Sequence, residues 1–413
     1  MAVTREAAAK TRLRSQRERL LGATLKVVAE RGYEATRVED LLAASGVSRN
    51  AFYKVFSNKH ECFLAAVDLV VELSGPSVLD VYGQTPGSWE ERMKAMLDAL
   101  AATVVGHPAA ARVAWIEAYA AGGDAVERVD RIDARTERIV RGALTECPQR
   151  AGMPPEAVRA LIGGLRKMIH SRLREGREQD LPGEMPQILD WMLSYRTPPQ
   201  RLRRPRRPPE GRVPPVPAPE KSRDRIVAAV AELVAEKGYQ SMAITEIAHR
   251  AAVSLTTFYE LFYGKEDAFL ATMDHGIQRA TNAVLPVYTA APDWPHAVAA
   301  GLHAFFAVFS VDPALGRLGG IGPYESGLAG MESLDRGIAS AQTLLERGFE
   351  LHPETPRIAS EAIGTSIYSL MSRQVRRRGA QHLYEVAPTA AFIALAPFVG
   401  SDEAARVANA EPV

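Results

Sequence analysis

Two short stretches of this sequence place polar side chains where they could bind the edges of nucleic-acid bases. In GVSRNAFYKVF, residues 46–56, Arg49 and Asn50 follow a serine and precede two aromatic residues. An arginine binds guanine through O6 and N7, and an asparagine binds adenine through N6 and N7. In the first turn of a helix anchored by Phe52 and Phe56, both polar side chains would face outward. The chemistry indicated is the reading of base pairs by hydrogen bonds.

Neighbouring side chains could hold the sugar-phosphate backbone beside such a reading helix. The Tyr53 hydroxyl could bind a phosphate, and Lys59 would add positive charge at the start of the next helix. Ser48 is suited to cap the reading helix. The same pattern also fits a helical hairpin with a capped second helix and solvated surface charge, and both interpretations stay open on these residues alone.

The segment that holds this stretch occurs twice. Residues 19–68 align without a gap on residues 225–274, at a constant offset of 206 (225 − 19). The counterpart of GVSRNAFYKVF is AVSLTTFYELF, residues 252–262. A period this long marks the duplication of a whole domain and not a solenoid repeat. Identical pairs along the alignment include Gly32 and Gly238, Tyr33 and Tyr239, Ser48 and Ser254, Phe52 and Phe258, Tyr53 and Tyr259, and Lys59 and Lys265.

The elements that position these residues are expected to be helices. In ERLLGATLKVVAERGY, apolar residues share one stripe that ends at Gly32, a suitable left-handed position after a helix. VEDLLAASGVSRNAFYKVF indicates a short helix, a turn at Gly46 and a second helix, and a longer helix follows Asn58. No convincing alternating strand pattern occurs, so the predicted fold class is all-α. The glycine-rich stretch GRLGGIGPYESG, residues 316–327, is expected to be a loop between helices.

The stretch between the two copies is expected to be a linker. Proline and arginine crowd RTPPQRLRRPRRPPEGRVPPVPAPEKS. Because proline lacks an N–H and fixes φ, this composition predicts an extended, semi-rigid spacer. The expected domains are a basic N-terminal arm at 1–18, a first helix-turn-helix domain at 19–68, a first helical effector or dimerisation domain at 69–196, the linker at 197–220, a second helix-turn-helix domain at 221–274 and a second helical domain at 275–413.

Positive charge lies next to the two copies, although the whole chain carries only +1. Residues 1–20 hold six basic and two acidic side chains, a net charge of +4. Residues 196–225 hold ten basic and three acidic side chains, a net charge of +7. Each run could seek phosphates beside a reading helix, or could simply be a solvated run of charge.

Several other function classes find little support in the sequence. Cys62 and Cys147 lie far apart and form no zinc motif, which fits a reducing compartment. The charged N-terminus lacks the apolar segment of a secretory signal, and apolar runs near the end, such as AAFIALAPFVG, fall short of a bilayer span. No metal-binding histidine motif, phosphate-binding loop or nucleophile–base pair occurs. We therefore expect no enzyme activity, no cofactor, no metal and no membrane contact, and a cytoplasmic location.

The duplicated segments resemble a known family of regulators. GYEATRVEDLLAASGVSRNAFYKVFSNKHECFL and GYQSMAITEIAHRAAVSLTTFYELFYGKEDAFL are similar to the N-terminal DNA-binding segment of the tetracycline-repressor-like (TetR) transcriptional regulators. The resemblance covers about fifty residues in each half. SRLREGREQDLPGEMPQILDWML and SRQVRRRGAQHLYEVAPTAAFIAL are similar to the last two helices, through which such regulators dimerise. The chain is thus expected to be two fused TetR-like units.

This resemblance implies a ligand-responsive repressor or activator, associated with the nucleoid, that binds a double-stranded DNA operator. It also implies an apolar pocket for a small effector in the helical domain of each half. The residues expected to face DNA are Ser48, Arg49, Asn50, Tyr53, Lys54 and Lys59 in the first head and Ser254, Thr256, Thr257, Tyr259 and Lys265 in the second. The residues that could line a pocket, or belong to the core, are Met93, Trp115, Tyr119, Phe305, Phe309 and Tyr324.

The second copy departs from the family's pattern. Its turn residue is Ala252 where the first copy has Gly46, so a positive φ there would be strained. Leu255 replaces the charge of Arg49, and Glu260 would repel phosphates. We therefore expect the first head to bind DNA more strongly. The alternatives are a second head that is only structural, a pseudo-dimer within one chain or a homodimer with four heads, and an interaction protein whose heads no longer bind DNA.

Overall fold

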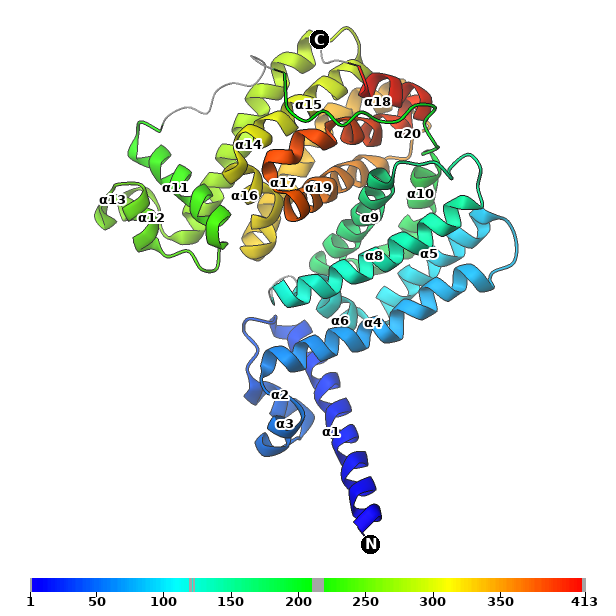
Figure 1. The fold of residues 1–413 in the computed structure, drawn as a ribbon, viewed down its shortest axis with the longest axis vertical. Coiled ribbons are helices and arrows are strands. Elements are labelled where there is room, and N and C mark those ends of the chain that lie inside the picture. Colours follow the sequence, from blue (N-terminus) through cyan, green and yellow to red (C-terminus); the bar gives the residue numbers. More distant parts are fainter. Residues whose placement is uncertain (1, 119–120, 122, 210–218, 411–413) are drawn as a thin grey trace. The chain divides into compact units, whose positions relative to one another are not determined.

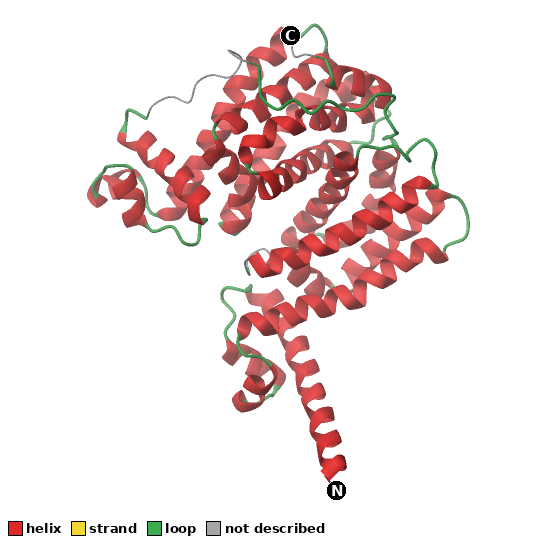
Figure 2. Cartoon of the chain, viewed as in Figure 1, coloured by secondary structure: helices red, strands yellow, loops and turns green. Residues whose placement is uncertain are grey.

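The chain is described by a computed structural model that covers residues 2–118, 121, 123–209 and 219–410. Within these ranges the regular elements are helices, and no strand occurs among them (Figure 2). This confirms the all-α fold class. Side chains are described for fewer residues, which excludes those of residues 1–12 and several in the ranges 73–79 and 119–133.

The first copy and the region behind it contain helices α1 to α10 (Figure 1). Their bounds are α1 Ala2–Arg31, α2 Val38–Ser45, α3 Arg49–Val55, α4 Lys59–Gln84, α5 Trp89–Gly106, α6 Pro108–Arg112, the π-helical turn η1 Val113–Glu117, α8 Gly123–Thr145, α9 Pro155–Glu175, the 3-10 turn η2 Glu178–Asp180 and α10 Leu181–Leu193.

The second copy and the region behind it contain helices α11 to α20. Their bounds are α11 Ser222–Lys237, α12 Ile244–Arg250, α13 Leu255–Leu261, α14 Lys265–Ala290, α15 Trp294–Val311, α16 Pro313–Glu325, α17 Leu328–Gln342, η3 Thr343–Leu345, α18 Glu346–Leu351, α19 Ile358–Arg378, η4 Ala380–Val386 and α20 Ala387–Ala408.

The chain divides into two compact units. Unit 1 consists of residues 1–143 and 169–189, and unit 2 consists of residues 144–168 and 190–413. This division differs from the boundary of the sequence duplication, because two segments that precede the linker belong to the unit of the second copy.

Each head is a three-helix domain with its own core. In the first head, α2 and α3 pack on the C-terminal half of α1 (Figure 1), and Leu41 and Phe52 are fully buried between them. In the second head, Ile247 and Phe258 take the same places beneath α11. The apolar stripe expected on α1 is buried as predicted, because it faces this core. The helix-turn-helix layout thus follows from the helical spacing of apolar residues.

The two heads repeat the same polar contacts. Arg31 pairs with Asp40 at 2.7 Å in the first head, and Lys237 pairs with Glu246 at the corresponding place in the second. Lys59 donates to the Tyr33 carbonyl at 2.8 Å, and Lys265 donates to the Tyr239 carbonyl at 3.2 Å. The duplication therefore preserves the internal scaffold of the head as well as its sequence.

The glycine-rich stretch at 316–327, expected to be a loop, is helical through Glu325. That expectation was wrong because its glycines serve close packing. A Cβ at Gly316 would lie 2.4 Å from the Phe309 carbonyl oxygen, and one at Gly320 would lie 2.9 Å from Val375. Tertiary contacts of α16 thus override the low helix propensity of glycine.

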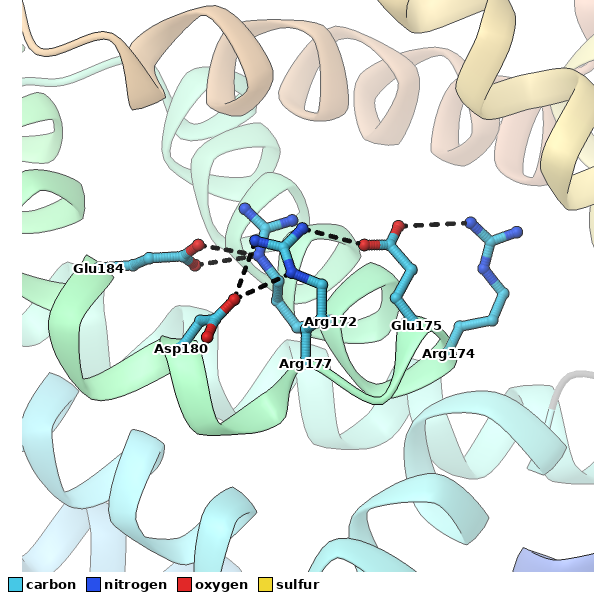
Figure 3. A network of polar contacts seen from close by, with 6 residues as sticks. All are labelled: Arg172, Arg174, Glu175, Arg177, Asp180 and Glu184. Carbon is cyan, nitrogen blue, oxygen red and sulfur yellow. Dashed lines mark hydrogen bonds and ion pairs between the residues drawn. The ribbon is translucent and has the colours of Figure 1, made fainter.

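A network of ion pairs joins the end of α9 to the start of α10 (Figure 3). The buried Arg172 donates to Glu184 at 2.9 Å, and Arg177 pairs with Asp180 at 2.9 Å and with Glu175 at 3.2 Å. This turn lies in the stretch that resembles the dimerisation helices of the family. The network links the end of α9 to η2 and the first turn of α10.

In unit 2, segments that precede the linker pack against helices of the second copy. Lys167, with only 3% of its side chain exposed, binds Asp335 at 2.9 Å. A Cβ at Gly164 would lie 2.1 Å from the Ser366 hydroxyl, so the backbones of α9 and α19 approach closely. The Tyr195 hydroxyl donates to the Ile393 carbonyl at 2.8 Å. These helices therefore share one interior.

The start of the expected linker is fastened to the end of α20. The Arg196 amide donates to Ser401 at 2.8 Å, and the Arg203 amide donates to Asn409 at 2.7 Å. Residues 197–209 contain no helix, as the proline content predicts. Residues 210–218 lie outside the described residues.

Two helical segments of the described chain are long and apolar enough to cross a membrane. They are Trp294–Val311, with 61% of its apolar window buried inside the protein, and Ala380–Ala408, with 83% buried. A third candidate, Trp89–Gly106 followed by Pro108–Glu117, is bent by 101°. The expectation that the apolar runs fall short of a bilayer span was therefore wrong by length and composition. Burial in the interior of unit 2 accounts for the apolar character of the first two.

Candidate nucleic-acid interface and effector cavity

The first reading helix is α3, and Ser48 is its N-cap. The Ser48 hydroxyl accepts a hydrogen bond from the Ala51 amide at 3.3 Å, and the helix begins at Arg49. Phe52 is fully buried and Phe56 nearly so. The opposite face is exposed and carries the polar residues predicted to face DNA: Arg49, Asn50, Tyr53 and Lys54.

Arg49 has a partner that sequence reasoning missed. Its guanidinium pairs with Glu39 at 2.5 Å, and both side chains are more than 60% exposed. An exposed pair of this kind contributes about 0–1 kcal/mol, so Arg49 can leave Glu39 at little cost. The ten-residue separation between two helices gave no local signal for this pair. The second head has Thr245 and Leu255 at these places and cannot form it.

Lys59, predicted to face DNA, points into the head instead of toward solvent. Its ammonium lies 4.1 Å from the centre of the Tyr33 ring and donates to the Tyr33 carbonyl. Partial burial lowers the pKa of Lys59, which the charge of Glu34 opposes. Lys265 repeats this geometry at 4.5 Å from the Tyr239 ring. Both lysines are therefore engaged within their heads.

The second reading helix, α13, presents a more apolar face. Ser254 caps it through the Thr257 amide at 2.9 Å, and the two hydroxyls also bond at 2.9 Å. Thr256 is exposed. Leu255 is 45% exposed and Tyr259 57% exposed. Of the residues predicted to read DNA here, Thr256 and Tyr259 stand out from the surface, whereas Thr257 is occupied by the cap.

The turn before α13 is strained as expected. Ala252 has φ 51°, the single positive φ of a non-glycine residue among those described. The corresponding Gly46 has φ 63° without strain, because it lacks a Cβ. The second head therefore keeps the shape of the turn at an energetic cost.

Charge also separates the heads. Residues 19–68 hold seven basic and six acidic side chains, a net charge of +1, whereas residues 225–274 hold four and seven, a net charge of −3. In the second head Arg250 is bound by Glu236 at 2.6 Å and by Glu232 at 3.2 Å. The hydrogen bonds that Arg250 donates to these carboxylates, first of all to Glu236, raise the pKa of its guanidinium. The second head thus offers less free positive charge to phosphates.

A cavity of about 290 Å³ lies among the helices of unit 2. Its lining comes largely from α14, α15, α16, α17 and α19, and none of the described residues that line it carries an ionisable group other than tyrosine. Tyr288 and Tyr368 donate to backbone carbonyls at 2.9 and 3.2 Å, so their hydroxyls are already used. The cavity therefore suits an uncharged, apolar molecule.

The predicted pocket residues fall in different places. Phe305 and Phe309 line this cavity. Tyr324 does not line it and instead packs near Tyr368, with ring centres 5.9 Å apart. In unit 1, Met93 is buried and Trp115 is half-buried in η1. Tyr119 lies outside the described residues.

Among the described residues no group of three or more His, Cys, Asp or Glu could hold a metal ion. Buried polar groups have internal roles of other kinds. The His303 ring nitrogen Nδ1 lies 3.0 Å from the Tyr384 hydroxyl, and burial lowers the pKa of His303 to about 4.

Comparison with known proteins agrees with the geometry of the heads. The family model described as bacterial regulatory proteins, tetR family, matches residues 20–66 and again residues 226–272. The curated relatives include an uncharacterised HTH-type transcriptional regulator, YezE, from Bacillus subtilis (strain 168). It is 32% identical over 75 residues, which are 18% of this chain and 38% of the relative. A second uncharacterised HTH-type regulator, encoded in the lacX 3′ region of Lactococcus lactis subsp. lactis, is 30% identical over 86 residues, 21% and 44% of the two chains.

Solved structures of similar chains include the regulator FadR from Bacillus subtilis in complex with stearoyl-CoA. It is 17% identical, covers 43% of this chain and 97% of its own, and has a TM-score of 0.39. The fatty acid degradation regulator FadR from Bacillus halodurans has the same TM-score and 14% identity. This chain spans about two fifths of the length of the curated relatives it matches. The two family matches establish that this chain carries the N-terminal domain of the tetR family twice.

Proposed function

We propose that the chain is a sequence-specific DNA-binding transcriptional regulator whose first head is the main reader. The observation that carries this proposal is the exposed face of α3, where Arg49, Asn50, Tyr53 and Lys54 stand opposite the buried Phe52. A reading helix with this face can enter a major groove and bond to base edges. The net charge is +1 on the first head and −3 on the second, which also favours stronger DNA binding by the first head.

Selection from a random DNA pool, followed by fluorescence-anisotropy titration, tests this function. A specific reader is expected to prefer its selected site over scrambled DNA by about 10³-fold or more. Asn50→Ala is expected to cost about 1–3 kcal/mol on that site and to relax the base preference at one position. Thr256→Ala, at the matched position of the second head, is expected to cost less. Lys94→Ala, at an exposed position of α5 outside both heads, serves as the control for a polar side chain removed away from the reading helices.

Equal binding of the wild type to selected and scrambled DNA would contradict the proposed function. It would favour a second candidate, an interaction protein that acts through a partner. A specific observation supports that candidate for the second head: Leu255, Tyr259 and Tyr263 are exposed on or beside α13 in an acidic domain. Tyr263 is 99% exposed.

We further infer that an uncharged, apolar effector binds in the cavity of unit 2. The cavity is lined from α14, which begins at Lys265 directly after the second reading helix, so the cavity and the second head share one helix. An ionised ligand group would find no opposite charge among the described lining residues. Titration with an uncharged apolar fluorescent probe and with its carboxylated analogue would separate the two ligand classes.

A pseudo-dimer within one chain is the assembly we propose. Three contacts support this assembly: Lys167 is buried against Asp335 of α17, Gly164 approaches Ser366 of α19, and Tyr195 binds Ile393 of α20, so segments that precede the linker already cover helices of the second copy in unit 2. A homodimer formed through these same surfaces would require them to separate. Sedimentation of the purified chain at micromolar concentration is expected to give a monomer of 44.9 kDa. A dimer that dissociates when Lys167 is replaced would contradict this assembly.

A further inference from the structure

The Gly-Tyr turn of each head, Gly32–Tyr33 or Gly238–Tyr239, receives a carboxylate from a distant helix. The Tyr33 amide donates to Glu117 at 2.7 Å, and the Tyr239 amide donates to Glu325 at 2.9 Å. The two glutamates lie 84 and 86 residues from their tyrosines. The contact thus occurs in both copies although the residues fall outside the aligned segments.

Each turn is bound from two sides by opposite charges. In the first head the Tyr33 amide faces the Glu117 carboxylate and the Tyr33 carbonyl faces the Lys59 ammonium. In the second head Glu325 and Lys265 take these places. Hydrogen bonds to charged groups are about twice as strong as neutral ones, so each turn is held more firmly than an ordinary loop.

The helix dipole and burial both act against a negative charge at this place. Each Gly-Tyr turn follows the C-terminus of a helix, α1 or α11, where the helix dipole disfavours negative charge. Burial raises the pKa of Glu117, which the hydrogen bond from Tyr33 opposes. A cation or a neutral side chain would suit a helix end better. A carboxylate at this place is explained if its role is to bind the head to the helical domain that carries it.

In the second head the glycine of the turn makes room for the carboxylate, whereas in the first head a Cβ would meet it at an ordinary contact distance. A Cβ at Gly238, where φ is 81°, would lie 3.1 Å from a carboxylate oxygen of Glu325, and one at Gly32 would lie 3.6 Å from Glu117. Glu325 is further held by Arg317 at 3.7 Å, and its own carbonyl accepts from Gln240 at 3.0 Å. In the second copy, the Glu325 carboxylate is therefore the centre of a contact between the head and α16.

We propose that Glu117 and Glu325 are positioning residues that set the orientation of the two reading heads by binding the backbone of the Gly-Tyr turn. They do not contact DNA. They fix the end of α1 or α11, and through it the angle at which α3 or α13 is presented. The effect on DNA binding rests on the proposed function, whereas the contact itself does not.

Amide hydrogen exchange of the full chain without DNA tests the contact. Glu117→Ala is expected to increase exchange at the Tyr33 amide by about tenfold and to leave Tyr239 unchanged, and Glu325→Ala is expected to do the reverse. Glu117→Gln and Glu325→Gln keep an acceptor without the charge and should give smaller increases. Glu72→Ala and Glu350→Ala, at exposed positions in the same two units, are the matched controls. Unchanged exchange at the tyrosine amide in folded variants, including the glutamine variants if alanine prevents folding, would overturn the proposal.

DNA affinity supplies the second readout. For a wild type that binds its selected site, Glu117→Ala is expected to lower affinity about tenfold with an unchanged salt dependence, because no phosphate contact is lost. An unchanged affinity in a variant whose Tyr33 amide is released would overturn the positioning role. If the wild type itself does not distinguish DNA sequences, the proposed function fails, and the exchange experiment still decides whether the carboxylates hold the turns.

Discussion

The turn between the last two helices of each head, α2 and α3 or α12 and α13, allows backbone strain to be tested in both directions. Gly46 has φ 63°, and a Cβ built there would meet no atom within 4 Å. Gly46→Ala would therefore cost only the left-handed backbone, about 1–2 kcal/mol, reduced by the 0.4–1 kcal/mol that alanine gains through a more restricted unfolded chain. The net expectation is a loss of about 0.5–1 kcal/mol. Ala252→Gly, at φ 51°, should stabilise the second head by the same amount of free energy, about 0.5–1 kcal/mol.

Hydrogen exchange of peptides from each head measures these changes in the full chain, where a single unfolding transition is not assured. The expected change in protection is about two- to fivefold, downward for Gly46→Ala in the first head and upward for Ala252→Gly in the second. Gly22→Ala is the control, because Gly22 lies inside α1 without a positive φ and should gain up to about 1 kcal/mol in helix stability. Unchanged or reduced protection of α12 and α13 in Ala252→Gly would refute the strain argument.

Three further changes test separate parts of the account. Glu39→Gln releases Arg49 and should tighten DNA binding about two- to fivefold at low salt in anisotropy titrations, whereas Thr245→Ala at the matched place in the second head should not. Burial lowers the pKa of His303 from its ordinary 6.5 to about 4. The buried neutral ring therefore costs no stability above pH 6.5. As the pH falls toward 4 the unfolded chain binds a proton that the folded one does not, and unit 2 loses about 3 kcal/mol of unfolding free energy. In His303→Gln, urea unfolding at pH 7 and pH 5 should show a smaller acid loss than in the wild type. Ala280→Phe places a ring in the cavity and should abolish binding of an uncharged apolar probe without loss of thermal stability; undiminished probe binding would place the site elsewhere.

The heads were predictable from sequence because their determinants are local. Helical spacing identified the buried stripe of α1, and the cap at Ser48 follows from residue type and position. The strain at Ala252 was expected from the loss of a glycine that the turn requires, and its positive φ agrees. Each of these features depends on residues within one or two turns of helix.

Features that depend on distant contacts were not predictable. The helix α16 contains four glycines, and only its packing against residues such as Phe309 and Val375 explains why it is helical. The pairing of Arg49 with Glu39, and the binding of the Gly-Tyr turns by Glu117 and Glu325, join elements that carry no shared motif. In the sequence, a charged side chain that binds a distant element looks the same as one that faces solvent, so only the tertiary structure distinguishes the two.

The inequality of the two heads is the central claim, and footprinting of the full chain on its selected DNA site tests it most directly. The account predicts an asymmetric site, in which one half-site is strongly protected and loses protection in Arg49→Ala, while the other half-site is weakly protected and responds to Leu255→Ala. A perfect palindrome with equal protection of both halves, reduced equally by either substitution, would contradict it.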